Sequence, residues 1–194
     1  MSPDELGRRV AALVEGAVAD VSFGQVSVDV PATSWVDAAM AVRDDDAISC
    51  RFFDWLSAYD DEADQLAVVL HVWSTQHRHH LRLRTHVPRD GGNLASLTGV
   101  WPGANWHERE TYEMFGVTFD GHPNLLPLLL PDGFEGHPLR KDFVLASRVA
   151  KTWPGAKEPG ESDRDTHGSP GRRRMLPPGV PAPDEWGPAA GDPE

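Results

Sequence analysis

Hydrophobic positions in the first part of the chain predict a helix, a strand and a second helix. Residues 5–19 (ELGRRVAALVEGAVA) carry apolar side chains at helical spacing, which places these side chains on one face. Residues 23–30 (FGQVSVDV) alternate apolar and polar positions, as a strand with one buried face does. A proline follows this strand, and Thr33 or Ser34 can cap a short helix that runs through Arg43.

Three runs rich in β-branched and aromatic residues come next and predict a meander of antiparallel strands. They cover residues 48–59, 66–74 and 80–87, and acidic or polar turns separate them. Residues 94–115 return to helical spacing in two pieces, which a Pro-Gly pair divides. The expected order is α-β-α-β-β-β-α. It predicts an α+β fold of two layers, with helices on a mainly antiparallel or mixed sheet.

The composition changes near residue 150. Residues 151–194 contain 16 Pro or Gly in 44 positions, and their only aromatic side chains are Trp153 and Trp186. Such a segment cannot bury enough apolar surface to offset the conformational entropy that it would lose on folding. We therefore expect a folded domain at residues 1–150 and an extended tail at residues 151–194, which is disordered alone and becomes ordered on partners.

Charge, cysteine content and hydropathy exclude several classes of function. The formal net charge is −12, which opposes binding to a nucleic-acid backbone. Cys50 is the single cysteine, so the chain cannot form an internal disulfide or supply a four-cysteine iron–sulfur site. The most apolar run, residues 125–130 (LLPLLL), has six residues, whereas a membrane-spanning helix needs about 20. The start (MSPDELGRRV) lacks the apolar core of a secretory signal, and we expect a cytosolic protein.

Motifs for cofactor binding and nucleophilic catalysis are absent from the sequence. It contains no GxGxxG, no GxxxxGKS/T and no GxSxG pattern, so the usual loops for dinucleotides, nucleoside triphosphates and a nucleophilic serine are missing. Residues 107–111 (HERET) begin like the helix of a zinc protease, but Thr111 stands where the second histidine is needed. We therefore expect no catalytic, cofactor-binding or metal-binding residue in this chain.

A histidine cluster leaves one chemical alternative open. His77 and His79 are two residues apart, so on a strand they share a face and can chelate a metal. Together with Glu110 they would form a free-standing metal-binding or hydrolytic enzyme. The ordinary interpretation is a polar hairpin turn, because Arg78 and Arg82 add positive charge that opposes a bound cation.

Residues 106–115 predict a helix with an apolar face and a charged face. Trp106, Met114 and Phe115 are expected to pack inward. The expected charged face consists of Glu108, Arg109, Glu110 and Glu113. An ion pair between side chains one turn apart, such as Arg109 and Glu113, contributes only a few tenths of a kcal/mol. Taken alone, the pattern favours a solvated face over an acid–base site, because no nucleophile or metal ligand adjoins it in the sequence.

The segment after this helix combines turns, leucines and charge. Residues 119–123 (FDGHP) recur fifteen positions later as residues 134–138 (FEGHP). Between them, residues 125–130 contain five leucines, whose exposure to water is unfavourable by about 0.8 kcal/mol per uncovered CH₂. These leucines are therefore expected to pack on this domain or on a partner.

These residues resemble the family of the C subunit of proton-pumping NADH-quinone oxidoreductase, the 30-kilodalton subunit of respiratory complex I. The first matching block comprises Glu108-Arg109-Glu110, Glu113-Met114-Phe115-Gly116 and His122. The second block comprises Leu130-Pro131 and Glu135-Gly136-His137-Pro138-Leu139-Arg140-Lys141-Asp142-Phe143. The chain departs from the family's usual pattern at Glu113, where aspartate is common, and at Leu126 and Pro127, where basic residues are common.

The resemblance implies a non-catalytic assembly subunit in the peripheral arm of the oxidoreductase, on the cytoplasmic side of the cell membrane. It implies contact with the quinone-site D subunit and with the B and I subunits, which carry iron–sulfur clusters, and a tail that runs over the quinone-site subunit. Flavin mononucleotide and the iron–sulfur clusters would lie in partner subunits. The residues implied at partner interfaces are Glu108, Arg109, Glu110, Glu113, His122, Glu135, Gly136, His137, Pro138, Arg140, Lys141 and Asp142.

Two further expectations accompany this interpretation. The chain could be the equivalent subunit of a related complex that takes electrons from reduced deazaflavin or hydrogen. In either complex, Arg140→Glu is expected to weaken co-purification with the quinone-site subunit while the isolated domain stays folded.

Overall fold

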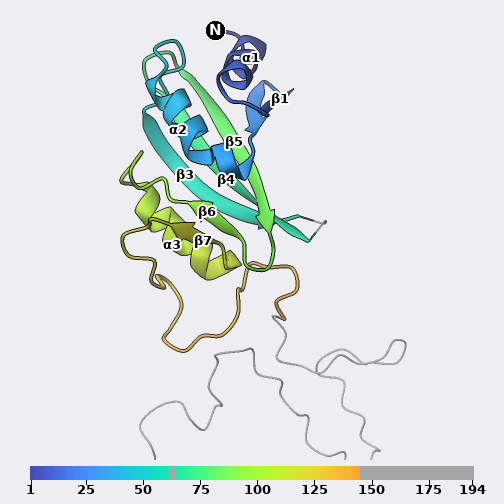
Figure 1. Ribbon diagram of the computed structural model, residues 1–194, viewed down its shortest axis with the longest axis vertical. Coiled ribbons are helices and arrows are strands. Elements are labelled where there is room, and N and C mark those ends of the chain that lie inside the picture. The colour runs from blue at the N-terminus through green and yellow to red at the C-terminus, as the bar shows by residue number, and fades with distance from the viewer. Residues whose placement is uncertain (62–63, 145–194) are drawn as a thin grey trace, which may run out of the picture. The chain divides into compact units, whose positions relative to one another are not determined.

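The computed structural model describes residues 1–61 and 64–144 (Figure 1). The contacts divide the chain into two units, the first formed by residues 1–130 and 137–141. The elements, in chain order, are α1 (Pro3–Leu13), β1 (Val18–Ser22), β2 (Gln25–Asp29), the 3₁₀ turn η1 (Ala32–Ser34), α2 (Trp35–Asp44), β3 (Phe52–Asp60), β4 (Gln65–Ser74), β5 (His79–Pro88), β6 (Asn93–Ala95), α3 (Ala104–Phe115) and β7 (Thr118–Asp120).

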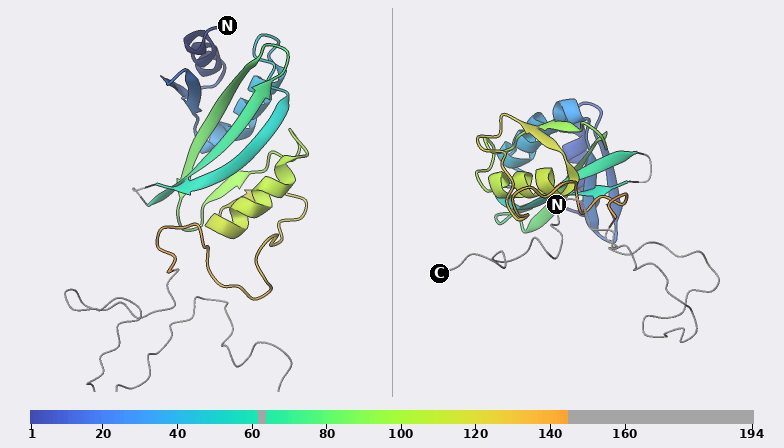
Figure 2. Two further views of the ribbon diagram at one scale, coloured as in Figure 1. Left: turned by 180° about the vertical axis from the view of Figure 1, so that it is seen from behind. Right: turned by 90° about the horizontal axis from the view of Figure 1, so that it is seen from below.

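A five-stranded mixed sheet forms the centre of the first unit. Its strand order is β1-β2-β5-β4-β3, with β2 and β5 parallel and the other neighbours antiparallel. The predicted meander of three antiparallel strands is confirmed as β3, β4 and β5. Helix α2 lies on one face of these strands, which is the far face in the left view of Figure 2. The expected two-layer α+β fold is therefore confirmed.

The N-terminal part differs from the prediction in its helix end and its strand number. The helix begins at Pro3, where Ser2 and Glu5 form a reciprocal capping box, and it ends at Leu13 instead of continuing to residue 19. The strand predicted at residues 23–30 is confirmed as β2, but an unpredicted strand, β1, precedes it and forms a hairpin with it. Its turn is Phe23-Gly24, with φ of 53° and 75°. The sequence pattern did not reveal it because hairpin turns of this kind usually carry Asn-Gly.

The first helical piece predicted within residues 94–115 is wrong. Asn93–Ala95 instead forms β6, which pairs in parallel with β7 in a separate two-stranded sheet. A three-residue strand is too short to show an alternating pattern, so its periodicity could not be recognised. The second piece is confirmed as α3. The helix at residues 35–44 is also confirmed, although the side chain of Ser34 makes no capping hydrogen bond.

Apolar burial between α1, α2 and the sheet forms the core. Fully buried side chains include Trp35 on α2, Leu70 on β4 and Leu83 on β5. Cys50 belongs to this core, and burial raises the pKa of its thiol to about 12. The thiol therefore stays protonated near neutral pH and is a poor nucleophile.

In the second unit, the described residues are 131–136 and 142–144. Phe134 and Phe143 stack with ring centroids 5.9 Å apart. Gly136 has φ of 92°, and a Cβ at this position would lie 3.2 Å from the Phe143 ring. Glycine is therefore the residue that this turn accepts most readily. The predicted tail at residues 151–194 lies outside the described residues, and the predicted boundary at residue 150 stays a prediction.

Candidate functional site

Helix α3 lies along β3, at the edge of the five-stranded sheet (Figure 1). His107 on α3 reaches this edge, since its Nδ1 lies 3.1 Å from the carbonyl oxygen of Leu56. Ala104, Thr111 and Phe115 are buried on the inner side of the helix. The residues that resemble the 30-kilodalton subunit family therefore begin on a helix that the sheet holds in place.

Glu113 holds the segment that follows α3 and β7, residues 122–130, which we call the strap. Its carboxylate accepts three hydrogen bonds from consecutive backbone N–H groups, those of Leu128 (3.1 Å), Leu129 (2.8 Å) and Leu130 (2.8 Å). Glu113 is only 6% exposed. A buried carboxylate is unfavourable unless such donors surround it, so these contacts fix the strap backbone against α3.

Arg109 holds the strap at the preceding residues. Its Nε donates to the carbonyl oxygen of Leu126 and its Nη2 to that of Pro127, both at 2.8 Å. The guanidinium also lies 5.4 Å from the ring centre of Trp106. Arg109 and Glu113 thus bind neighbouring parts of the strap, and the ion pair considered between them does not form in the described part of the chain. Because Arg109 binds carbonyl groups, the unusual side chains at 126 and 127 leave this contact unchanged.

The expected charged face of α3 is wrong for two of its four members. Glu108 is fully buried and accepts hydrogen bonds from Ser96 Oγ and Leu97 N, both at 2.6 Å. Burial raises the pKa of Glu108, although these hydrogen bonds oppose the increase. Glu113 is buried as described above, whereas Trp106, expected to pack inward, is 61% exposed. Met114 and Phe115 are buried as predicted. The buried side of the helix also includes Glu108 and Glu113, because hydrogen bonds offset the burial of these two carboxylates.

Residues 137–141, which we call the return segment, bind the C-terminal end of α3. The last carbonyl groups of a helix have no partner within the helix. Here three of them accept one hydrogen bond each: Glu113 from His137 Nδ1 (2.9 Å), Met114 from Leu139 N (3.2 Å) and Phe115 from Arg140 Nε (2.6 Å). The positive charge of Arg140 also suits the negative end of the helix dipole.

Gly116 makes the approach of the return segment possible. It ends α3 in the left-handed conformation, with φ of 78°, and its N–H donates to the carbonyl of Tyr112 at 2.8 Å. A Cβ at this position would lie 2.6 Å from Arg140 Nη2 and 2.6 Å from His137 Nε2. Only glycine satisfies both the backbone angle and the close contact.

Arg140 and Lys141 connect the return segment to the β3–β5 side of the unit. Arg140 Nη2 donates to the carbonyl of Arg89 at 2.6 Å, and the backbone N–H of Lys141 donates to Asp60 at 2.8 Å. Asp60 also forms an ion pair with Arg89 at 2.6 Å, and its side chain is 1% exposed. Burial alone raises the pKa of Asp60, but the bonds from Lys141 and Arg89 outweigh it, and the net pKa is lowered.

This network changes the outcome expected for Arg140→Glu. The side chain of Arg140 is 12% exposed and contacts carbonyl groups of its own domain. A glutamate there would face the carbonyl oxygens of Phe115 and Arg89, so it would detach the return segment. Asp60 and Arg89 complete this network, and sequence analysis missed both. Their partners are distant in sequence, and only the acid at the end of a predicted strand gave any signal.

The two Gly-His-Pro turns bind opposite ends of α3. His122 Nε2 donates to the carbonyl of Asn105 at 3.1 Å, while its Nδ1 accepts from Asn124 N at 3.0 Å. His137 binds the other end through the carbonyl of Glu113. The repeated motif therefore serves one structural purpose twice, which is to hold irregular chain against one helix.

The remaining residues implied at interfaces differ in exposure. Lys141, Glu135, Gly136 and Asp142 are exposed, and Glu110 and Pro138 are half-buried. Their contacts with partners stay predictions. The leucines of the strap were expected to pack on this domain or on a partner. Leu125 and Leu130 pack against the core of the domain, whereas Leu126 and Leu129 are 57% and 59% exposed.

Four large apolar side chains on and around α3 are each more than half exposed. They are Trp106, Leu126, Leu129 and Leu139, and we call them together the apolar rim. All four residues belong to α3 or to segments that hydrogen-bond to it. Exposed large apolar side chains on one helix and the segments bound to it favour contact with another protein.

The histidine cluster binds backbone carbonyl groups instead of converging on a metal. His77 Nε2 donates to Asp46 O at 2.8 Å, and His79 Nε2 donates to Ile48 O at 2.7 Å. Burial lowers the pKa of His79. Among residues 1–61 and 64–144, no group of three or more His, Cys, Asp or Glu side chains is arranged to hold a metal ion.

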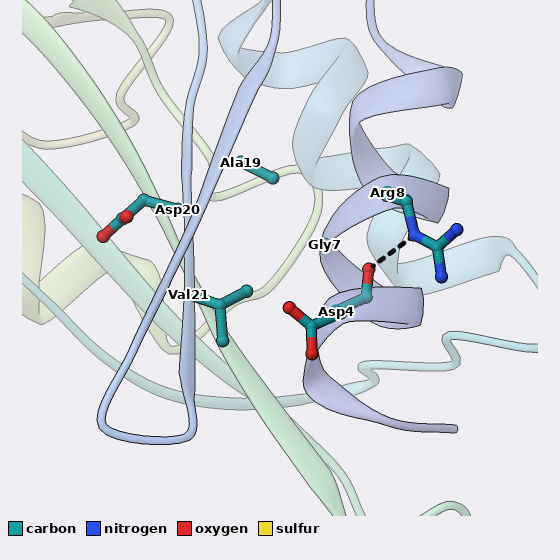
Figure 3. A pocket seen from close by; sticks show the side chains of 6 residues that line it. All are labelled: Asp4, Gly7, Arg8, Ala19, Asp20 and Val21. Carbon is teal, nitrogen blue, oxygen red and sulfur yellow. Dashed lines mark hydrogen bonds between the residues drawn. The ribbon is translucent and has the colours of Figure 1, made fainter.

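An open hollow of about 300 Å³ lies between α1 and β1 (Figure 3). Asp4, Arg8 and Asp20 contribute its polar lining, and Arg8 Nε donates to the carbonyl of Asp4 at 3.2 Å. None of the site residues described above lines it. Within the described residues, no helix has the length and apolar character needed to cross a bilayer.

Comparisons with known proteins agree on one family. Residues 28–149 match the family described as "Respiratory-chain NADH dehydrogenase, 30 Kd subunit". The C subunit of NADH-quinone oxidoreductase from Roseiflexus castenholzii is 41% identical over 156 residues, covering 78% of this chain and 90% of that protein. The same subunit from Caulobacter vibrioides is 38% identical over 149 residues, covering 74% of each chain.

Two solved structures share the fold. The trypsin-resistant fragment of Nqo5 superposes with a TM-score of 0.56 at 23% identity, covering 64% of this chain and all of that fragment. A chain of the membrane-bound sulfane sulfur reductase, an archaeal respiratory membrane complex, gives a TM-score of 0.62 at 23% identity, covering 73% and 85%. At this identity the likeness establishes the fold alone.

Proposed function

The chain belongs to the family of the 30 Kd subunit of respiratory-chain NADH dehydrogenase, and we propose that it acts in the NADH-quinone oxidoreductase as a docking subunit without catalytic residues. The partners in this proposal are the quinone-site D subunit and the B and I subunits, which hold iron–sulfur clusters. Flavin mononucleotide and the clusters lie in those or other subunits. The assembled complex holds the chain on the cytoplasmic side of the membrane.

The observation that carries the proposal is the strap fixed against α3 with the apolar rim facing outward. Polar side chains that resemble catalytic groups, Glu108, Arg109 and Glu113, bind the chain's own backbone or turns. These side chains therefore hold the strap and the neighbouring turns in place. What the site offers a partner is the apolar rim in a fixed conformation. A surface fixed in advance loses less conformational entropy on binding, which strengthens association.

The composition of the rim fits a protein interface. Trp106 supplies a large aromatic side chain, and Arg109 beside it supplies the planar cation that interfaces favour. Leu126 and Leu129 add branched apolar contacts on either side of Pro127. Burial of these exposed side chains by a partner would remove the unfavourable contact with water that they have in the isolated chain.

Paired serine substitutions test the proposal. Leu126→Ser/Leu129→Ser is expected to lower the amount of this chain in the purified oxidoreductase at least tenfold, while the melting temperature of the isolated full chain changes little, because both side chains are exposed. Leu13→Ser is the matched control, since Leu13 is 46% exposed at the end of α1. Normal incorporation of the double variant would contradict the proposal.

A second candidate is the same docking role in a complex that takes electrons from reduced deazaflavin or hydrogen. The fold of the chain in the archaeal sulfane sulfur reductase complex makes this candidate worth testing, because the fold is not restricted to NADH oxidation. Purifying the native complex separates the two. Companion subunits that bind NADH support the first candidate, and a complex without NADH oxidation but with another donor activity supports the second.

A further inference from the structure

The face of the sheet opposite α2 carries basic and aromatic side chains that are not part of the apolar rim. On β5, buried and half-buried side chains alternate, which places them in turn on the core side and on this outer face. The side chains that point to the outer face are half-buried and basic: His80, Arg82, Arg84 and His86. In a chain with a net charge of −12, this gathering of basic groups on one strand is unusual.

A β-bulge places an acid beside two of the histidines. The pairing of β3 with β4 shifts register between Phe53 and Trp55, which leaves Asp54 as the extra residue. Asp54 Oδ2 lies 2.8 Å from His71 Nδ1, and His71 Nε2 lies 2.7 Å from His80 Nδ1. The three side chains form a continuous hydrogen-bonded row across β3, β4 and β5.

Two tryptophans enclose this row. Trp55 stacks on His71 with ring centroids 5.5 Å apart and planes at 13°. Trp73 stacks on His80 at 5.0 Å and 29°, and it remains 37% exposed. The stacking and the hydrogen bonds keep the four rings in defined positions, which gives the outer face a rigid aromatic platform.

Arg82, a cation beside the platform, has no counter-ion among the described residues. Its neighbours on β5 do: Arg84 pairs with Asp29, and His86 lies 3.4 Å from Asp61. Arg82 stands directly opposite His71 in the pairing of β4 with β5. Its Nε is buried and has no hydrogen-bond partner within the described part of the chain. An unpaired buried donor is unfavourable. Arg82 as a whole is only half-buried, so a carboxylate from outside the chain can pair with the charge of its guanidinium.

We propose that this face, formed by Trp55, His71, Trp73, His80 and Arg82, binds an acidic segment of another subunit. A carboxylate of that segment pairs with Arg82, and its apolar atoms pack on the tryptophan rings. This inference rests on the proposed function in that it needs a multisubunit assembly, but it uses a surface separate from the apolar rim.

Charge decides against other occupants of the face. In a two-fold contact with its axis at Arg82, the two guanidinium groups would face each other, and like charges would oppose association. An extended anionic surface, such as a nucleic acid or an anionic membrane, meets the whole chain, and the net charge of −12 opposes that contact. A short acidic segment meets only the local charge of Arg82. An acidic protein segment is the occupant that matches both the charge of Arg82 and the aromatic platform.

Photo-crosslinking within the assembled complex tests the proposal. The photoreactive amino acid p-benzoylphenylalanine replaces Trp73 in the full chain, and Arg78 in the hairpin turn of β4 and β5 is the control position. We expect the probe at 73 to attach to an Asp- or Glu-containing peptide of another subunit in the purified complex. A probe that attaches to nothing, to lipid or to a second copy of this chain overturns the proposal.

Arg82→Gln measures the role of the charge. We expect this variant to bind complex depleted of the native chain about tenfold more weakly, with its melting temperature unchanged and with partial recovery in Arg82→Lys. Arg78→Gln is the matched control. Affinity of Arg82→Gln within about twofold of the native chain would overturn the proposal. If the native chain enters the complex while position 73 stays unattached, only this inference fails and the docking function stands.

Discussion

The five-stranded sheet and the strap differ in what holds them in place. The sheet buries Leu56, Leu70 and Leu83 completely, and apolar burial stabilises it. The strap leaves Leu126 and Leu129 exposed. It depends on hydrogen bonds between its backbone and two side chains of α3, Arg109 and Glu113. The comparison indicates that burial supplies the stability of the domain, while the hydrogen bonds set the shape of the surface that it presents.

The largest expected effect comes from a cavity in the sheet. Leu70→Ala removes a fully buried side chain on the central β4 and is expected to lower the free energy of unfolding by roughly 3 kcal/mol. Denaturant unfolding of the full chain checks the value. Small domains usually unfold as one cooperative unit, so we expect amide hydrogen exchange to accelerate throughout β3, β4 and β5. Faster exchange confined to the strap would contradict the role assigned to burial.

Glu113→Ala is expected to have a smaller and local effect. It removes the acceptor of three backbone N–H groups. We expect the free energy that holds the strap against α3 to fall by about 1–3 kcal/mol. Hydrogen exchange should accelerate at the amides of Leu128, Leu129 and Leu130, with the amides of β4 unchanged. Glu110→Ala on the same helix is the control. Equal acceleration in β4 would show that the strap contributes to global stability.

Phe23→Asn is expected to stabilise the chain slightly. Phe23 has φ of 53° and a fully exposed side chain at the tip of the β1–β2 turn. Asparagine adopts this conformation more easily, so the free energy of unfolding should rise by about 0.5–1 kcal/mol. Thermal unfolding against a Ser22→Ala control measures the change. A decrease would mean that the Phe23 side chain makes contacts that stabilise the fold.

The smallest expected effect is a dependence of sheet stability on pH. Burial lowers the pKa of His79 and of His80 below the usual value of 6.5. Between the lowered pKa and pH 6.5, the unfolded chain therefore binds more protons than the folded chain. The contribution to stability is complete above about pH 6.5 and is lost as the pH falls below it. Unfolding midpoints at several pH values check this, and His79→Asn/His80→Asn should weaken the dependence.

The sheet was predictable because its signal is local. Residues 66–74 and 80–87 indicate β4 and β5 through their own alternation and apolar content, and both strands formed within one residue of the expected bounds. Strand β1 was missed because Phe23-Gly24 is an atypical turn. Strand β6 was mistaken for helix because three residues show no period.

For the site, the sequence indicated which residues belong to it but not what they contact. Its residues stood out in the sequence as a dense motif, yet their roles depend on partners far along the chain. Glu113 meets residues 15 to 17 positions away, and Lys141 meets Asp60 across 81 positions. A pattern of spacing on one helix contains no information about such partners. The expected solvent-facing charges were therefore in part internal hydrogen-bonding groups.

The amount of the Glu113→Ala chain in the purified oxidoreductase tests the central claim most directly. The claim is that α3 holds the strap in the form that docks. Quantitative mass spectrometry of the complex should find the variant reduced at least tenfold relative to the native chain, although denaturant unfolding shows its sheet intact. Incorporation of Glu113→Ala at the level of the native chain would contradict the claim.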